Sequence, residues 1–173
     1  MTTLVTSLPS RAETARLDVR AFVEREAPSI LDYFGRRVPA EDAADLLGET
    51  LVVVARKTGS IPTNELNARM WLFGVARKVL STHRRSATRR TALSDKLRLE
   101  LRARPQAPDA AAHDEVREAI AALPALDREI IELVYWEGFT LEEVAGILSM
   151  RAATVRSRHA RAKEKLRVVL LAD

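Results

Sequence analysis

The sequence of 173 residues has no cysteine, only six glycines and few aromatic residues. Without cysteine, a disulfide or a cysteine-based zinc site is excluded. No window approaches the ~18 apolar residues of a membrane span. The first residues, MTTLVTSLPSR, lack the basic start and the apolar run of a secretory signal. We therefore expect a cytoplasmic protein without membrane insertion.

Scarce glycine is accompanied by abundant alanine, leucine and arginine, and no stretch alternates apolar and polar residues for long. This composition favours helices over strands. The sequence shows no nucleophile beside a base, no metal-ligand cluster and no phosphate-binding loop. It predicts an all-α protein without enzymatic activity, metal or cofactor.

The net charge of +4 is unevenly distributed along the chain. Residues 67–104 carry 11 basic and 2 acidic side chains (+9), residues 105–150 carry 2 and 10 (−8), and residues 151–173 carry 7 and 2 (+5). An evenly solvated surface rarely separates its charges so far. The pattern is typical of a protein that contacts DNA at two places and other proteins between them.

Residues 139–166 predict a helix-turn-helix. Apolar residues recur at offsets of three and four, as on one face of a short helix: Leu141, Val144, Ala145 and Leu148. Thr140 and Glu143 form the capping-box pattern at its start. Residues 149–151 interrupt the pattern, and a second helix resumes it with Val155, Ala162 and Leu166. Two helices joined by so short a turn favour this motif.

The second helix of the motif carries hydroxyl and cationic side chains opposite its apolar face. They are Thr154, Ser157, Arg158, Arg161 and Lys165, with Arg156 on the flank. Arginine binds a guanine edge or a phosphate with two parallel hydrogen bonds, and short side chains let a helix approach a groove closely. The helix therefore predicts DNA binding, and the alternative is a basic, solvated C-terminal helix.

We expect three helical segments in the half of the chain that precedes the one with the helix-turn-helix. Residues 15–37 read as two consecutive helical pieces, because Pro28 predicts a break or kink near Ala27. Residues 39–57 read as a helix that starts at proline and acids, with Leu47, Leu51 and Val54 facing inward and Asp45, Glu49 and Arg56 facing outward. An acidic outer face of this kind is usually only solvated.

The third segment, residues 65–90, ends in a basic cluster that consists of His83, Arg84, Arg85, Arg89 and Arg90. Trp71 and Phe73 lie a few turns earlier. Cations beside aromatic rings predict a surface that holds a nucleic-acid backbone and stacks an unpaired base. The alternative, that Trp71 and Phe73 are core residues, remains open here.

Two prolines and small residues in 104–112 indicate a linker. Beyond it, apolar spacing predicts a helix from Asp114 to Leu123 and another from Pro124 to Trp136. We expect two small helical domains, residues 12–98 and 114–171, joined by a flexible linker at 99–113. The second domain contains the helix-turn-helix.

Taken in order, these segments resemble the bacterial RNA polymerase sigma factors of the extracytoplasmic function (ECF) group. The resemblance covers about residues 15–170 and is carried by FVEREAPSILDYFGRRV, AADLLGETLVVVARK, WLFGVARKVLSTHRR and ALPALDREIIELVYWEGFTLEEVAGILSMRAATVRSRHARAKEKLR. It implies a transcription initiation factor with two domains, region two and region four. The implied partners are core RNA polymerase, promoter DNA and an anti-sigma factor, although no residue in the sequence identifies the last.

The resemblance also implies roles for individual residues. Those expected to dock on polymerase are Asp45, Leu46, Glu49 and Thr50. Those expected near the melted minus-ten element are Trp71, Arg77, Lys78, His83, Arg84 and Arg85. Those expected to read the minus-thirty-five element are Arg156, Ser157, Ala160 and Arg161, with Arg151, Thr154 and Arg158 near the phosphates.

Four positions depart from the family's pattern: Lys78, Thr82, Ser149 and His159. Ser149 replaces a frequent turn glycine, so the turn is expected to be strained or differently shaped. His159 replaces an apolar residue that faces the first helix of the motif, and we expect it to be packed and neutral.

Two other functions remain compatible with the sequence. A stand-alone helix-turn-helix regulator explains residues 114–170 but leaves the acidic helix and the segment 71–90 without a role. A protein-interaction scaffold, whose basic helices meet an acidic partner, explains the charge blocks without DNA.

Overall fold

The computed structural model describes residues 17–97 and 114–170. Its helices are α1 (Val19–Gly35), α2 (Ala40–Arg56), the short 3-10 turn η1 (Thr58–Ser60), α3 (Glu65–Leu97), α4 (Asp114–Ala121), α5 (Ala125–Tyr135), α6 (Leu141–Leu148) and α7 (Ala152–Leu170). These residues contain no strand, which confirms the predicted all-α class. The predicted linker, 99–113, lies outside the described residues.

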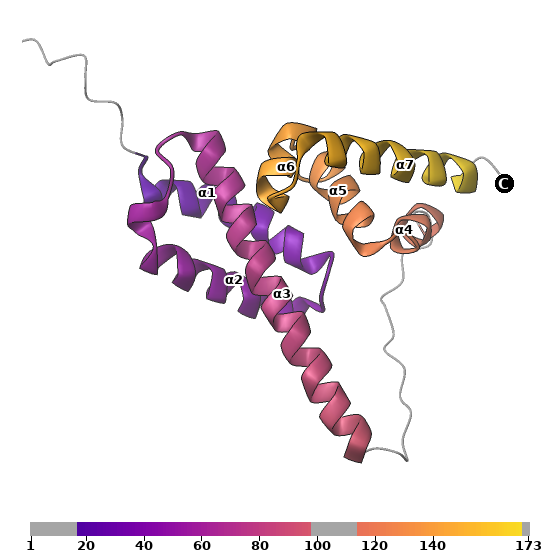
Figure 1. Cartoon of the computed structure of the whole chain (residues 1–173). Helices are drawn as coiled ribbons and strands as arrows, with labels where there is room; N and C mark the ends of the chain where they lie inside the picture. The colour runs from indigo at the N-terminus through magenta and orange to yellow at the C-terminus, as the bar shows by residue number, and fades with distance from the viewer. Residues whose placement is uncertain (1–16, 98–113, 171–173) are drawn as a thin grey trace, which may run out of the picture.

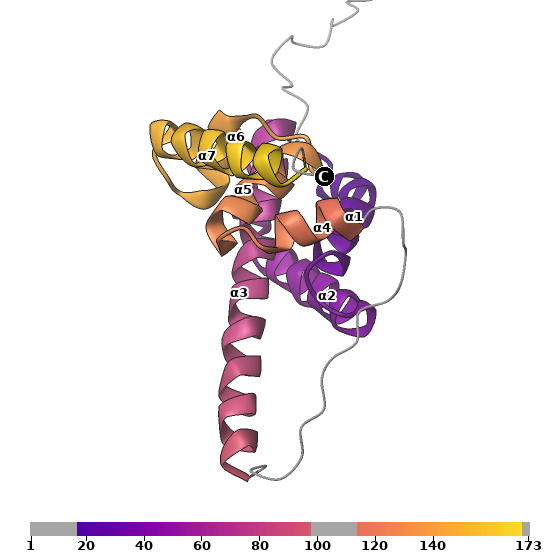
Figure 2. The same ribbon diagram turned by 90° about the vertical axis from the view of Figure 1, so that its right-hand side faces the viewer.

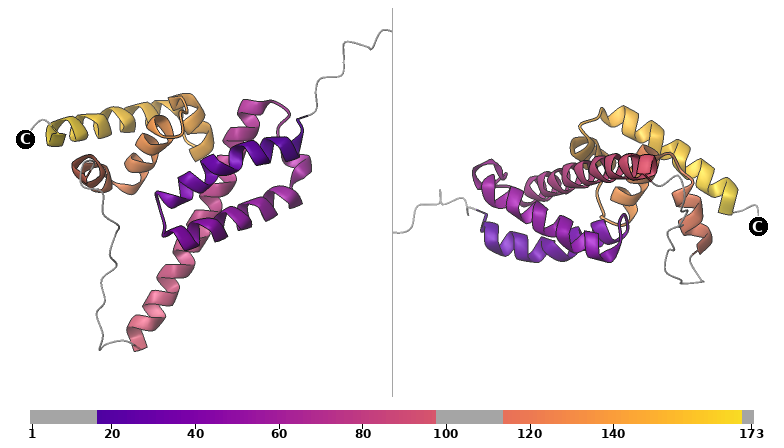
Figure 3. Two further views of the ribbon diagram at one scale, coloured as in Figure 1. Left: turned by 180° about the vertical axis from the view of Figure 1, so that it is seen from behind. Right: turned by 90° about the horizontal axis from the view of Figure 1, so that it is seen from below.

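Helices α1 and α2 form an antiparallel pair that packs on the first part of α3 (Figure 1 and Figure 3). The carboxylate of Asp18 caps α1 by accepting the backbone N–H groups of Arg20 and Ala21, at 3.0 and 3.1 Å. Helix α3 continues to Leu97, beyond the predicted end near residue 90, and its second part projects away from the other helices (Figure 2).

Helix α1 is continuous, so the predicted division into two helical pieces near Ala27 is wrong. A proline inside a helix removes one backbone hydrogen bond and usually kinks or breaks it. Here the helix buries side chains on both sides of the proline, Phe22 before it and Ile30 and Phe34 after it. Burial of these large apolar side chains on one face offsets the loss of a single hydrogen bond.

The second half of the chain, α4 to α7, wraps around a small core to which Ile130, Val144 and Val155 contribute fully buried side chains. Gly138, with a φ of +74°, redirects the chain between α5 and α6 in a conformation that favours glycine.

The two halves also meet each other, because α6 lies against α3. The ring of Phe73 on α3 packs edge-to-face on Phe139, which precedes α6, with 5.0 Å between centroids. Buried residues of both halves therefore form one continuous hydrophobic cluster.

Candidate nucleic-acid interface

The helix-turn-helix consists of α6, a short turn and α7. The Thr140 hydroxyl accepts the backbone N–H of Glu143 at 3.3 Å, and the Glu143 carboxylate accepts the N–H of Thr140 at 2.9 Å. This is the predicted capping box. It fixes where α6 begins and leaves two fewer backbone donors unsatisfied.

Ser149 occupies the turn in the left-handed conformation, with φ 54° and ψ 44°. The N–H of Met150 donates to the carbonyl of Ala145 at 2.9 Å, and the N–H of Ser149 donates to Gly146 at 3.2 Å. This is a Schellman ending, which glycine usually provides. The turn therefore keeps its ordinary shape, and serine bears the strain of its Cβ.

Helix α7 buries one face and exposes the other. Val155 and Ala162 are completely buried and Leu166 is partly buried, as the apolar spacing predicts. The exposed side chains include most of the predicted DNA-binding residues: Arg151, Thr154, Arg156, Ser157, Ala160, Arg161 and Lys165. The helix thus presents one open face with four cations and two hydroxyls, which suits a groove of DNA.

The arginines of α7 differ in their partners. Arg158 is half-buried and donates to the carboxylate of Asp127 on α5 at 2.7 Å. Arg156 is exposed and pairs with Glu142 on α6 at 2.8 Å. Arg151 and Arg161 are exposed, and within the described part of the chain neither forms an ion pair. Arg158 therefore ties α7 to α5, whereas Arg161 is free to meet a ligand.

His159 is half-buried and its ring stacks on Tyr135, with 5.8 Å between centroids and 20° between planes. Burial, reinforced by the charge of Lys163, lowers the pKa of the imidazole below its ordinary value. The side chain is neutral near pH 7, as expected. It stacks on the end of α5, where the sequence led us to expect the first helix of the motif.

The two aromatic residues of α3, Trp71 and Phe73, differ in their burial. Phe73 is a core residue, only 1% exposed, which favours the core interpretation for that ring. Trp71 is half-buried at the edge of the core. Of the two rings, only Trp71 keeps accessible surface for stacking.

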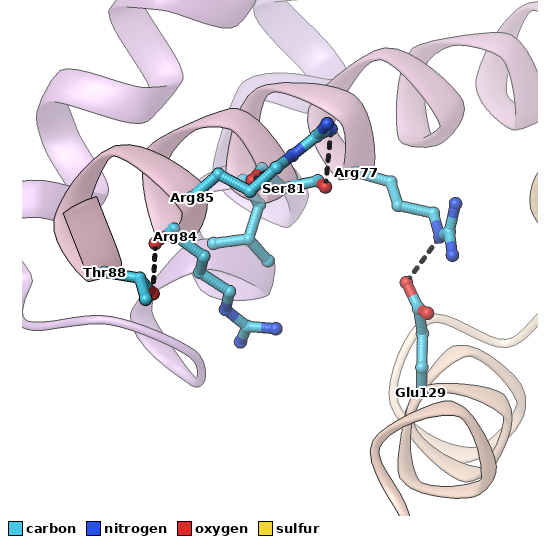
Figure 4. Close-up of a pocket in the computed structure, with 7 residues that line it drawn as sticks. Arg77, Ser81, Arg84, Arg85, Thr88 and Glu129 are labelled. Atoms are coloured by element: carbon cyan, nitrogen blue, oxygen red, sulfur yellow. Dashed lines mark hydrogen bonds and ion pairs between the residues drawn. The ribbon is translucent and has the colours of Figure 1, made fainter.

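Three basic side chains of α3, those of Arg77, Arg84 and Arg85, line an open cleft of about 520 Å³, which Figure 4 shows. Arg77 crosses the cleft to Glu129 on α5 at 2.8 Å, while Arg85 turns back to the hydroxyl of Ser81 at 3.1 Å. Arg84 points into the cleft, and its guanidinium forms no ion pair with a described residue. Three of the predicted cations are thus gathered at one place.

The remaining predicted residues of α3 lie at its sides. Lys78 is exposed, and His83 lies 3.7 Å from the carboxylate of Asp42 on α2, close enough for an ion pair when the imidazole is protonated. The side chains of Arg89 and Arg90 lie outside the described residues.

The acidic face of α2 is only partly as predicted. Asp45 and Glu49 are exposed. Leu46 and Thr50 are 1% and 0% exposed, and the Thr50 hydroxyl donates to the Leu46 carbonyl at 2.8 Å inside the fold. Both side chains thus lie inside the fold and not on the exposed face, because α2 turns them toward the core and leaves Leu47 and Leu51 half-buried. Their role in docking on polymerase stays a prediction.

The sequence did not reveal a set of ion pairs that joins the two halves. Arg36 and Arg37, at the end of α1, pair with Glu137 and Glu132 near the end of α5. Arg69 on α3 donates to the carbonyl of Glu137 at 2.9 Å. Burial raises the pKa of the carboxyls of Glu132 and Glu137, and the arginines oppose that effect. Only the acidic block at 105–150 hinted at such contacts.

Among residues 17–97 and 114–170, no helix combines the length and hydropathy needed to cross a membrane. The same residues hold no group of three or more histidine, aspartate or glutamate side chains arranged for a metal ion.

The helix-turn-helix half matches a known family model. Residues 113–166 fit the model described as Sigma-70, region 4. The helix-turn-helix half of the chain is therefore similar to region 4 of the sigma-70 factors.

Relatives extend the match over both halves. The chain is 30% identical over 156 residues to the ECF RNA polymerase sigma factor SigL of Mycobacterium tuberculosis, covering 88% of each protein. It is 32% identical over 136 residues to the ECF RNA polymerase sigma factor EcfG of Rhodopseudomonas palustris, covering 78% of this chain and 74% of that protein. The chain belongs to the family of ECF RNA polymerase sigma factors.

Solved structures agree. The sigma factor RpoE of Bartonella quintana, crystallised with the anti-sigma factor NepR, superposes with a TM-score of 0.71 and 25% identity over 90% of this chain and 98% of that one. CnrH, in complex with the cytosolic domain of CnrY, shares the fold with a TM-score of 0.61 and 22% identity over 94% and 95%.

Proposed function

We propose that this sigma factor directs core RNA polymerase to specific promoters by recognising a minus-ten and a minus-thirty-five element. As an ECF sigma factor, the chain acts in transcription initiation together with RNA polymerase. In the proposal, residues 12–98 serve as region two, residues 114–171 as region four, and residues 99–113 as the flexible linker. No bond is made or broken by the chain itself, so it is not an enzyme.

The observation that carries the proposal is the open face of α7. Arg156, Ser157, Ala160 and Arg161 lie on that face and have the chemistry for reading base edges in the major groove. Arg151, Thr154 and Lys165 flank them and suit phosphate contacts, which set position without reading sequence. Arg158 contributes by holding α7 against α5 through Asp127.

Region two is proposed to capture the melted minus-ten strand along α3. Trp71 offers a stacking surface, and Arg77, Lys78, His83, Arg84 and Arg85 supply charge for the backbone. Strand opening then comes from holding unpaired bases. Asp45 and Glu49 are the exposed acids of α2 that are proposed to dock on polymerase.

Two weak contacts on one chain reinforce each other, because binding at one element raises the effective concentration at the other. A stand-alone regulator would not need α2 and α3. The match to the ECF sigma factors extends over 88% of this chain and so includes both helices. A protein-interaction scaffold would not need arginines and short side chains grouped on one open face of α7.

We also propose an anti-sigma protein as a partner, with the chain acting on DNA in the cytoplasm. The support is the likeness to RpoE of Bartonella quintana, which was crystallised with the anti-sigma factor NepR.

The test is transcription from pooled genomic fragments by purified core polymerase with and without the chain, with transcript starts mapped. The proposal predicts starts that depend on the chain and share two upstream elements. Replacing Arg161 with alanine should lower initiation at promoters with the preferred base. A core that is active with another sigma factor but starts nowhere with this chain would refute the proposal.

A further inference from the structure

A second cavity adjoins the open cleft of Figure 4 and shares Arg77, Arg84 and Glu129 with it. Its walls come from the residues just after α1, from α3 and from the first turns of α5. Its volume is about 590 Å³, within the range of small-molecule sites, which is roughly 300–1,000 Å³. Three segments that are distant in the sequence therefore enclose one space large enough for a ligand.

Cations outnumber anions on the walls of this cavity. The lining includes five arginines: Arg36, Arg37, Arg77, Arg84 and Arg128. Its acids are Glu129 and Glu132, and Glu137 adds a third carboxylate because it pairs with Arg36. Like charges that surround a space partly shielded from water repel one another. The excess of two cations therefore points to an anion as the ligand.

Two of the five arginines have no carboxylate partner. Arg36, Arg37 and Arg77 pair with glutamates of the second half of the chain. Arg84 and Arg128 form no ion pair with a described residue. Arg84 points into the space between α3 and α5 (Figure 4), and Arg128 lines the same cavity from α5, half-buried. Guanidinium groups on two different helices are thus available to one ligand.

The start of α5 adds to the attraction for an anion. Its N-cap is Pro124, which provides no side-chain hydrogen bond to the first turn. The first two residues of the helix, Ala125 and Leu126, line the cavity. The free N–H groups of a helix's first turn and the positive end of its dipole favour a negative charge nearby. This end of α5 therefore supports the arginines that surround it.

We propose that this cavity binds a small anion with several linked phosphates, either an inorganic oligophosphate or the phosphate chain of a nucleotide. The planar fork of arginine binds phosphate with two parallel hydrogen bonds. A single phosphate meets only one or two such forks, whereas a chain of phosphates reaches cations on several helices. A nucleic-acid strand instead needs an open groove that follows its backbone.

A ligand in this cavity would occupy Arg77 and Arg84, two of the cations proposed to hold the melted strand. It would therefore compete with the strand for α3. This consequence rests on the proposed function of those residues, but binding of the anion does not depend on it.

Calorimetric titration of the full chain with inorganic tripolyphosphate at fixed ionic strength tests the site. The wild type should bind one anion per chain. Arg128→Ala removes an arginine of the cavity that has no proposed role in binding DNA, and it should weaken binding about tenfold or more, as expected for a charge-assisted hydrogen bond. Arg117→Ala makes the same charge change on the exposed face of α4 and should leave the affinity unchanged. Equal affinities of these two variants, or no saturable binding to the wild type, would overturn the proposal.

Glu129→Gln tests the site in the opposite direction and also covers the case in which Arg128→Ala fails to fold. The substitution removes a negative charge from the lining and frees Arg77 from its ion pair. It should tighten tripolyphosphate binding up to about fivefold. Unchanged or weaker binding by Glu129→Gln would contradict an anion site in this cavity.

A parallel titration with adenosine triphosphate distinguishes the two sources of the phosphates. Equal affinities for the two anions would assign the site to the phosphate chain alone, and tighter binding of the nucleotide would assign it to a nucleotide. The same Arg128→Ala loss is expected for both, and its absence for both would overturn the proposal. A chain that binds tripolyphosphate in this way but starts no transcription with an active core would count against the proposed sigma function alone.

Discussion

Arg158 and Arg161 lie three positions apart on α7, yet their surroundings predict different effects of substitution on the free energy of unfolding. Arg158→Ala leaves the carboxylate of Asp127, 7% exposed, without its partner, so the free energy of unfolding should fall on the order of 1–3 kcal/mol. Arg161 is exposed and forms no ion pair with a described residue, so Arg161→Ala should change the free energy of unfolding by less than about 0.5 kcal/mol. Urea unfolding of the two variants makes the comparison, and equal losses would contradict the assigned roles.

His159 predicts a dependence of stability on pH. Because burial lowers the pKa of the folded-state imidazole, the unfolded state binds a proton first as pH falls below the ordinary value of 6.5. The free energy of unfolding should therefore decrease from pH 6.5 down to the lowered pKa and then level off. His159→Gln should remove that part of the slope in urea unfolding. An NMR titration of the histidine at or above its ordinary pKa would contradict the assignment.

The sequence predicted the chemistry of these residues, but it did not predict which residues surround them. It correctly placed Arg161 on an exposed face, because helical spacing fixes which residues oppose Val155 and Ala162. It could not distinguish Arg158 from Arg161, since the partner of Arg158, Asp127, lies 31 positions away on another helix.

At the level of the helices, substitutions at the two ends of α6 should change the free energy of unfolding in opposite directions. Thr140→Ala removes the side-chain cap and should lower the free energy of unfolding by about 1 kcal/mol. The same substitution at Thr154, on the exposed face of α7, is a control that should leave stability nearly unchanged. Thermal unfolding measures both, and equal destabilisation would contradict the role of the cap.

Ser149→Gly, at the other end of α6, should raise the free energy of unfolding. Glycine adopts the left-handed turn without the penalty of a Cβ, roughly 1–2 kcal/mol, while losing more chain entropy on folding, roughly 0.5–1 kcal/mol. The net gain should be about 0.5 kcal/mol, detectable as a higher urea midpoint. Destabilisation by glycine would show that the Ser149 side chain has a role beyond the turn.

Helix boundaries were predictable where a cap or a turn residue marks them, as Thr140 and Gly138 do. Two features were not. The burial of Phe22 and Ile30 on either side of Pro28 keeps α1 continuous, which local propensity does not report. On α2, several adjacent apolar residues left the register ambiguous, and Leu46 and Thr50 became the buried pair.

At the scale of the whole molecule, the order of segments predicted both halves and the family, but not their mutual contact. The residues that meet across it, such as Arg36 and Glu137, are 101 positions apart. Their pairing follows from how α6 lies on α3, which no local pattern encodes. The charge blocks were visible, but they were equally compatible with external partners.

The decisive measurement is the initiation frequency of the holoenzyme on one mapped promoter and on versions mutated singly in each element. Wild-type holoenzyme should lose initiation at both mutated elements, by about 1–3 kcal/mol per base position that is read directly. Arg161→Ala should be insensitive to one upstream base while it keeps full sensitivity to the minus-ten element, and Trp71→Ala should show the reverse. If both variants kept the wild-type sensitivity at every position of both elements, recognition of the promoter by these two halves of the chain would be contradicted.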